Sequence, residues 1–97
     1  MYVAVRRYEG TGDPAELGRR VQAGYVPLIR EVAGFVAYYC VDAGDGVVIT
    51  TSVFEDEAGA NESTKRAAEF VRENPSLFPN PAHVTAGDVV ASGKPSG

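Results

Sequence analysis

The sequence has little of the chemistry that most often reveals an activity. Its 97 residues include one cysteine, one histidine and no tryptophan. A lone cysteine, Cys40, forms no internal disulfide and builds no cysteine-based metal site. One histidine cannot furnish a multi-histidine centre, so we expect no metal. Neither a G-x-S-x-G motif nor a glycine-rich phosphate loop is present, which argues against the usual hydrolase and nucleotide-binding sites.

Positive charge and long apolar runs are also scarce. Nine Lys and Arg stand against 13 Asp and Glu, a net charge of -4. We therefore expect no nucleic acid partner, because phosphate binding needs clustered cations. No apolar run approaches the roughly 20 residues of a membrane-spanning helix, and two arginines precede any signal-like apolar core. These absences predict no membrane association and, with the unpaired Cys40, a cytoplasmic protein.

The residues that are present have the composition of a globular protein, 44% hydrophobic and 23% charged. We expect one domain over 1–91 and a flexible C-terminal tail over 92–97. Alternating apolar and polar residues predict strands at 2–9, 35–42, 47–54 and about 83–91. An Asp13 N-cap followed by Pro14 predicts a helix that ends at Gly34, and the acidic residues 55–57 begin a second helix that ends at Asn74-Pro75.

The element order β-α-β-β-α-β is the ferredoxin-like split βαβ arrangement of the α+β class. It predicts an antiparallel four-stranded sheet with both helices on one face. An interior proline, Pro27, predicts a kink near Tyr25–Pro27. The stripes expected to face the sheet are Leu17, Val21, Tyr25, Leu28, Ile29 and Val32 in the first helix and Ala60, Thr64, Ala67, Ala68 and Val71 in the second.

The other face of the sheet has no helix to cover it. Because strand 35–42 is apolar on both sides, we expect a second copy to pack sheet to sheet, which gives a homodimer. A monomer whose open face docks onto a different protein is the alternative.

Polar side chains on one face of the sheet form the candidate site. Alternation places Arg6 and Tyr8 on one face of the first strand, and they are the candidate catalytic residues. Phenol rings stack on planar ligands, and a guanidinium holds an oxyanion, so these residues predict a cavity for a small aromatic ligand. The candidate substrate-binding residues are Tyr25, Tyr38, Thr50, Ser52 and His83. Alternatively, Arg6 and the tyrosines cross the dimer interface and His83 lies on the surface.

Two segments, 32–39 (VAGFVAYY) and 52–57 (SVFEDE), lead into and out of the central hairpin. With the capped first helix they resemble the antibiotic biosynthesis monooxygenase (ABM) superfamily of dimeric α/β barrels, over residues 2–91. The resemblance implies a ferredoxin-like protomer, a dimer through the open sheet faces, and a pocket between sheet and helices. That superfamily includes cofactor-free monooxygenases acting on polyphenols or quinols, haem-degrading enzymes, and members without known activity.

The resemblance also separates these activities. Arg6, Ser63 and Glu73 stand where the haem-degrading branch has Asn, Trp and His, so we expect no haem and no other cofactor. The cofactor-free branch implies an oxidoreductase in which an aromatic substrate binds between sheet and first helix. Arg6 would stabilise its phenolate, and the carbanion-like form would reduce dioxygen directly. No base is evident, because tyrosine ionises near about pH 10. The alternative is a non-catalytic dimeric barrel that binds a small hydrophobic ligand or a protein partner.

Overall fold

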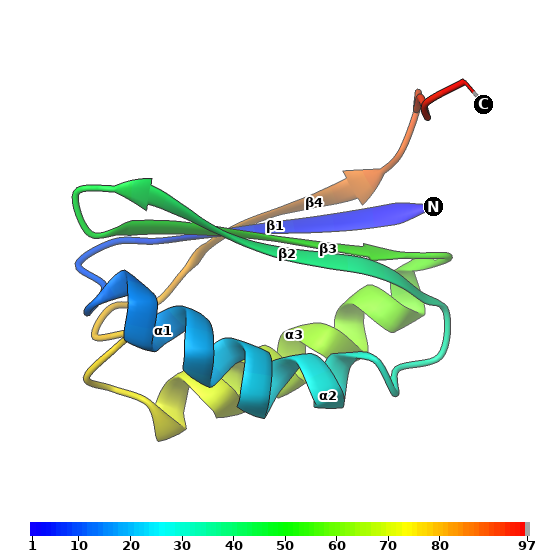
Figure 1. Ribbon diagram of the computed structural model, residues 1–97. Coiled ribbons are helices and arrows are strands. Elements are labelled where there is room, and N and C mark those ends of the chain that lie inside the picture. Colours follow the sequence, from blue (N-terminus) through cyan, green and yellow to red (C-terminus); the bar gives the residue numbers. More distant parts are fainter. Residues whose placement is uncertain (97) are drawn as a thin grey trace.

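The computed structural model describes residues 1–96 as a four-stranded antiparallel sheet with helices against one face (Figure 1). The strands are β1 (Tyr2–Tyr8), β2 (Phe35–Gly44), β3 (Val47–Phe54) and β4 (His83–Asp88), in the spatial order β2-β3-β1-β4. This arrangement confirms the ferredoxin-like α+β prediction. β4 ends at Asp88, earlier than the predicted 91, and the N–H of Val89 then donates a hydrogen bond to the carbonyl of Met1 (2.8 Å).

The tail expected over 92–97 carries no helix or strand from Ser92 to Ser96, and Gly97 lies outside the described residues. Nowhere between residues 1 and 96 does a helix have both the length and the hydropathy that crossing a membrane requires.

The first helical region is divided by a π-helical turn. It comprises α1 (Pro14–Arg20), the π-helical segment η1 (Val21–Tyr25) and α2 (Val26–Ile29). Within it, the N–H of Val26 bonds to the carbonyl of Val21, five residues back. Pro27 has no N–H, and its ring would clash with the carbonyl four residues back, so a wider turn before it accommodates the proline. This irregular turn lies where the sequence predicts a kink, near Tyr25–Pro27.

The π-helical turn changes which residues face the core. Its extra residue rotates the following turn, so Ile29 is fully buried whereas Leu28 is 42% exposed. The prediction that Leu28 belongs to the buried stripe is therefore wrong. The helix also ends at Ile29 rather than at Gly34, and Val32 packs into the core from the turn that follows.

The second long helix, α3 (Glu57–Glu73), lies closely against the sheet at its N-terminal end. Asp56 caps it by accepting a hydrogen bond from the N–H of Gly59 (3.1 Å). The buried positions are Gly59, Ala60, Ser63 and Ala67. Thr64 and Ala68 are exposed, so the stripe that faces the sheet is narrower than predicted. Small residues at this interface allow the close approach.

Gly59 lies where the helix and the sheet leave no space for a side chain. A β-carbon at this position would lie 2.9 Å from the carbonyl oxygen of Ala33 and 2.9 Å from the ring of Phe54. We expect Gly59→Ala to lower the free energy of unfolding by about 1–2 kcal/mol, because overpacking outweighs the gain in helix propensity. Gly18→Ala is the matched control: nothing lies within 4 Å of its β-carbon, so this variant should be stabilised. Urea denaturation measures both, and an equal gain in the two variants would contradict the close approach.

The two faces of the sheet differ sharply. The helix-facing side is buried and carries Ala4, Arg6, Tyr8, Val48, Thr50, Ser52 and Phe54. No helix from residues 1–96 covers the opposite side (Figure 1), and Tyr39 is 63% and Val41 49% exposed there. Within one protomer, the helices therefore cover only one of the two faces of β2.

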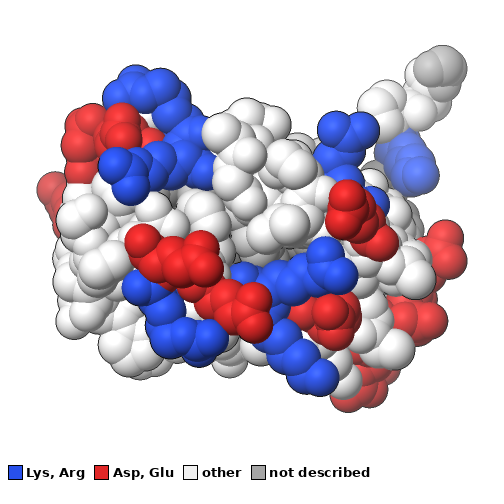
Figure 2. All heavy atoms as spheres, turned by 90° about the horizontal axis from the view of Figure 1, so that it is seen from below, with Lys and Arg blue, Asp and Glu red and all other residues white. Residues whose placement is uncertain are grey.

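The solvent-facing side of the helices carries both signs of charge. Figure 2 shows acidic and basic side chains interspersed over this face. Several form ion pairs along one helix, such as Glu16 with Arg19 (2.7 Å) and Glu62 with Arg66 (3.2 Å). This side is therefore an ordinary hydrated surface, and the candidate chemistry lies between helices and sheet.

Candidate functional site

Arg6 is a buried cation without an acidic partner among the residues that the structure describes. It is only 3% exposed, on the helix-facing side of β1. Its Nη2 donates a hydrogen bond to Oγ1 of Thr64 (2.6 Å), and its Nη1 donates to Oγ of Ser52 (3.4 Å). The ion pairs within residues 1–96 do not include Arg6. Since a guanidinium stays protonated and an uncompensated buried charge is costly, this geometry favours an anionic ligand.

A small cavity lies beside the guanidinium, between the sheet and the helices. Its volume is about 20 Å³, enough for roughly one water molecule. It is lined by Arg6, Tyr8, Val21, Tyr25, Tyr38, Thr50, Ala67, Phe70, Val71 and Phe78. The structure thus brings together Arg6, Tyr8, Tyr25, Tyr38 and Thr50 as predicted, and Ser52 adjoins them through its bond to Arg6. Aromatic side chains leave no room for a substrate ring here.

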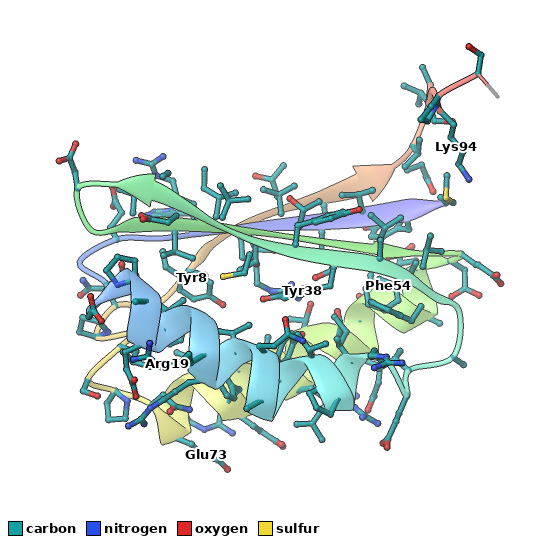
Figure 3. All side chains as sticks on the ribbon, viewed as in Figure 1. Tyr8, Arg19, Tyr38, Phe54, Glu73 and Lys94 are labelled. Carbon is teal, nitrogen blue, oxygen red and sulfur yellow. The ribbon has the colours of Figure 1, made fainter. Side chains whose placement is uncertain are left out.

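The three tyrosines of this cavity are packed against other rings. The centroids of Tyr25 and Tyr38 are 5.3 Å apart, and those of Tyr8 and Phe78 are 4.8 Å apart. Tyr25 also donates a hydrogen bond to the carbonyl of Ser63 (3.2 Å). Figure 3 shows Tyr8 and Tyr38 beneath the sheet, on the side of the helices. The rings are therefore part of the core as well as of the candidate site.

Burial makes these tyrosines weak acids. It raises the pKa of Tyr25 to about 12, and it raises the pKa of Tyr38 further from its ordinary value. Burial also raises the pKa of Tyr8, although the nearby Arg6 opposes the shift. All three phenols stay neutral near pH 7, where they can donate hydrogen bonds but cannot act as bases.

His83 lies on the other side of the sheet, so its assignment to the site is wrong. In the antiparallel pairing of β1 with β4, His83 lies opposite Arg7. Directly opposed residues share a face, and Arg7 points away from the face of Arg6 because side chains alternate along a strand. His83 is exposed there. It is the only histidine, and it is absent from the cavity that Arg6 lines.

A larger hollow adjoins Arg6 between α3 and β4. This groove has a volume of about 290 Å³. It is lined by Arg6, Tyr8, Thr64, Ala67, Ala68, Val71, Arg72, Pro81, Ala82 and Val84. Apart from the two arginines, Tyr8 and Thr64, these residues are apolar. Ring-sized space next to the buried guanidinium therefore lies here, rather than between the sheet and the first helix.

The helical spacing of α3 does not predict this groove. It places Thr64 and Ala68 in the stripe that faces the sheet, whereas they line the groove. A helix rich in small residues covers little of the neighbouring strand, and every residue of β4 from His83 to Asp88 is exposed. The run of small side chains in α3 was the available indication of a hollow.

A second open groove, of about 620 Å³, runs between the first helical region and the edge of β2. Tyr38 and Cys40 line it, but Arg6 and Tyr8 do not. Burial raises the pKa of the Cys40 thiol, so the thiolate, which is the reactive form, is disfavoured. In the part of the chain that the structure describes, no three His, Cys, Asp or Glu side chains could hold a metal ion together.

Neither a protein-family model nor a curated protein matches this sequence. Several solved structures match it in fold. A monooxygenase from the gene ActVA-Orf6 of Streptomyces coelicolor, in complex with Nanaomycin D, is 25% identical at a TM-score of 0.75, covering 98% of this chain and 92% of that one. SnoaB, a cofactor-independent oxygenase from Streptomyces nogalater, is 16% identical at a TM-score of 0.73, and the likeness covers 94% of each chain.

A third structure, an antibiotic biosynthesis monooxygenase, is 16% identical at a TM-score of 0.69, covering 94% of this chain and 100% of that one. Each of the three likenesses extends over nearly all of the chain. They confirm, at the level of the fold, the resemblance carried by segments 32–39 and 52–57.

Proposed function

We propose that this chain, which has the fold of the antibiotic biosynthesis monooxygenases, is a cofactor-independent monooxygenase of aromatic phenols or quinols. The phenolate of the substrate binds in the groove between α3 and β4, against the guanidinium of Arg6. The observation that carries the proposal is that Arg6 is 3% exposed, has hydroxyl partners only, and lines an apolar groove of about 290 Å³. An oxyanion would supply the missing counter-charge.

The reaction balances with dioxygen as the only co-reactant. The electron-rich phenolate passes electrons to dioxygen, and a C–O bond forms at a ring carbon that carries hydrogen. The outer oxygen of this peroxide takes up the proton that the phenol released. The ring carbon then loses its own proton while the O–O bond breaks and hydroxide leaves, and that hydroxide and proton combine as water. The phenol becomes a quinone that holds one oxygen atom, and the other atom leaves as water. Arg6 favours the first step, because a neighbouring cation lowers the pKa of the bound phenol.

None of the three cavity tyrosines can act as a base near pH 7, so the pH dependence of the rate should come from the substrate. Because their pKa values are raised, Tyr8, Tyr25 and Tyr38 should give no inflection in the rate between about pH 6 and 9. The rate should instead rise as the bound phenol ionises. Across a series of substituted naphthols, the midpoint should move by about one pH unit per unit of phenol pKa. A midpoint common to all substrates would indicate a protein base and contradict this mechanism.

Oxygen uptake with quinols and anthrone tests the activity itself. We expect one dioxygen consumed per quinone formed, with one atom of isotopically labelled dioxygen in the product. A non-catalytic barrel is the second candidate, and the filled interior cavity of about 20 Å³ favours it. Binding of these compounds without oxygen uptake by the full chain would support that candidate and overturn the monooxygenase.

We also propose that the chain is a homodimer formed through the uncovered sheet face. The exposed apolar side chains Tyr39 and Val41 lie on that face. The segment after β4 rises from the same side of the sheet in Figure 1, away from the helices. Arg6 and Tyr8 lie on the opposite, helix-covered side, so packing of two sheets would leave the groove on each protomer intact.

A further inference from the structure

We infer that the groove holds a second anionic group as well as the phenolate, so that its preferred ligand is a phenol bearing a carboxylate. This inference deepens the proposed function and rests on it. It follows from the charges that line the groove: Arg6 at its buried base and Arg72 at its exposed rim. No Asp or Glu among the described residues lines it.

Arg72 is available for such a ligand. No ion pair within residues 1–96 includes it, although Glu69 and Glu73 are close in sequence on the same helix. It lies eight residues after Thr64, which is about 12 Å further along α3. Helical side chains lean toward the N-terminus of their helix, so the side chain of Arg72 leans toward the preceding turn, which carries Ala68. Its place among the lining residues agrees with that direction.

The two cations differ in what they can recognise. Arg6 is buried, and Ser52 and Thr64 fix its orientation, so it meets the less accessible anion, the phenolate. Arg72 is exposed, so it meets a group at the open end of the groove. A carboxylate suits it, because guanidinium and carboxylate form two parallel hydrogen bonds. Between them lie the apolar side chains of Ala68, Val71 and Val84, which suit a planar ring.

A matched pair of ligands tests the inference: hydroxynaphthoic acid and its primary amide, which share the phenol and differ in one charge. Calorimetric titration of the full chain should show the acid binding about fivefold tighter than the amide, as expected for a partly exposed ion pair. In Arg72→Gln the acid should weaken to the level of the amide, and the amide should be unchanged. Arg19→Gln, an exposed arginine on α1, is the control and should keep the preference.

The outcomes separate this inference from the proposed function. If both compounds bind the wild type equally, or if the preference for the acid survives in Arg72→Gln, the carboxylate site is wrong while the phenol site stands. If neither compound binds, both are wrong. A preference that disappears at high salt in the wild type would support an electrostatic origin, because salt screens partly exposed pairs.

Discussion

Arg6→Met is expected to weaken phenolate binding about 10- to 100-fold while leaving the melting temperature unchanged or higher. Hydrogen bonds between charged groups contribute about 1.5–3 kcal/mol, which corresponds to that loss. Methionine is unbranched and apolar, so it fills the space of the arginine's aliphatic stem without a buried charge. Replacing a buried charge that lacks an ionic partner by an apolar residue is often neutral or stabilising.

This combination of results distinguishes a ligand-binding role from a structural one. Arg6 connects β1 to α3 through Thr64 (2.6 Å), and a purely structural role would make Arg6→Met unstable. Fluorescence titration with a naphthol and thermal denaturation measure the two quantities on the same samples. Arg19→Met serves as the control for loss of an arginine, since that side chain is 68% exposed. Normal binding together with a fall in stability would overturn the assignment of Arg6.

Arg6→Lys tests the same role of the side chain if the methionine variant fails to fold. Lysine retains the charge but cannot reproduce the planar guanidinium that bonds to both Ser52 and Thr64. Phenolate binding should therefore fall between wild type and the methionine variant. Equal binding by Arg6→Lys and wild type would show that charge alone matters at this position.

Tyr39→Lys is expected to convert the proposed dimer into a monomer. Tyr39 lies in the middle of β2 opposite Thr51, is 63% exposed in the protomer, and belongs to the uncovered face. Sheet-to-sheet packing would bury the lysines of both copies, and an uncompensated buried charge costs about 3–5 kcal/mol. The dissociation constant should rise at least about 100-fold, whereas the protomer should remain folded because the site is open to solvent.

Sedimentation equilibrium over a range of concentrations measures this effect. Leu28→Lys is the control, because Leu28 is also an exposed apolar residue (42%) but lies on the helical side. It should leave the dimer intact. A wild-type protein that is monomeric at all concentrations would overturn the proposed homodimer, and a Tyr39→Lys dimer of wild-type affinity would show that the interface lies elsewhere.

The sequence alone determined the elements and their order, because these depend on local physical chemistry. Alternation in residues 2–9 placed Arg6 and Tyr8 on the same face, and the structure agrees. The Asp13 cap and Pro14 set the start of α1, where the Asp13 side chain accepts from the N–H of Glu16 (3.1 Å). Pro27 predicted an irregularity in the helix, and the π-helical turn lies just before it. Each of these features depends only on residues that lie close together in the sequence.

The tertiary structure alone decided which of those residues meet. The face of His83 depends on the register of β4 against β1, and a shift of one residue would reverse it. The exposure of Leu28 depends on the extra residue in η1, which alternation and spacing do not reveal. The groove exists because α3 approaches the sheet over Gly59 and leaves β4 uncovered. These are relations between distant segments, whose relative positions are set by packing and not by local sequence.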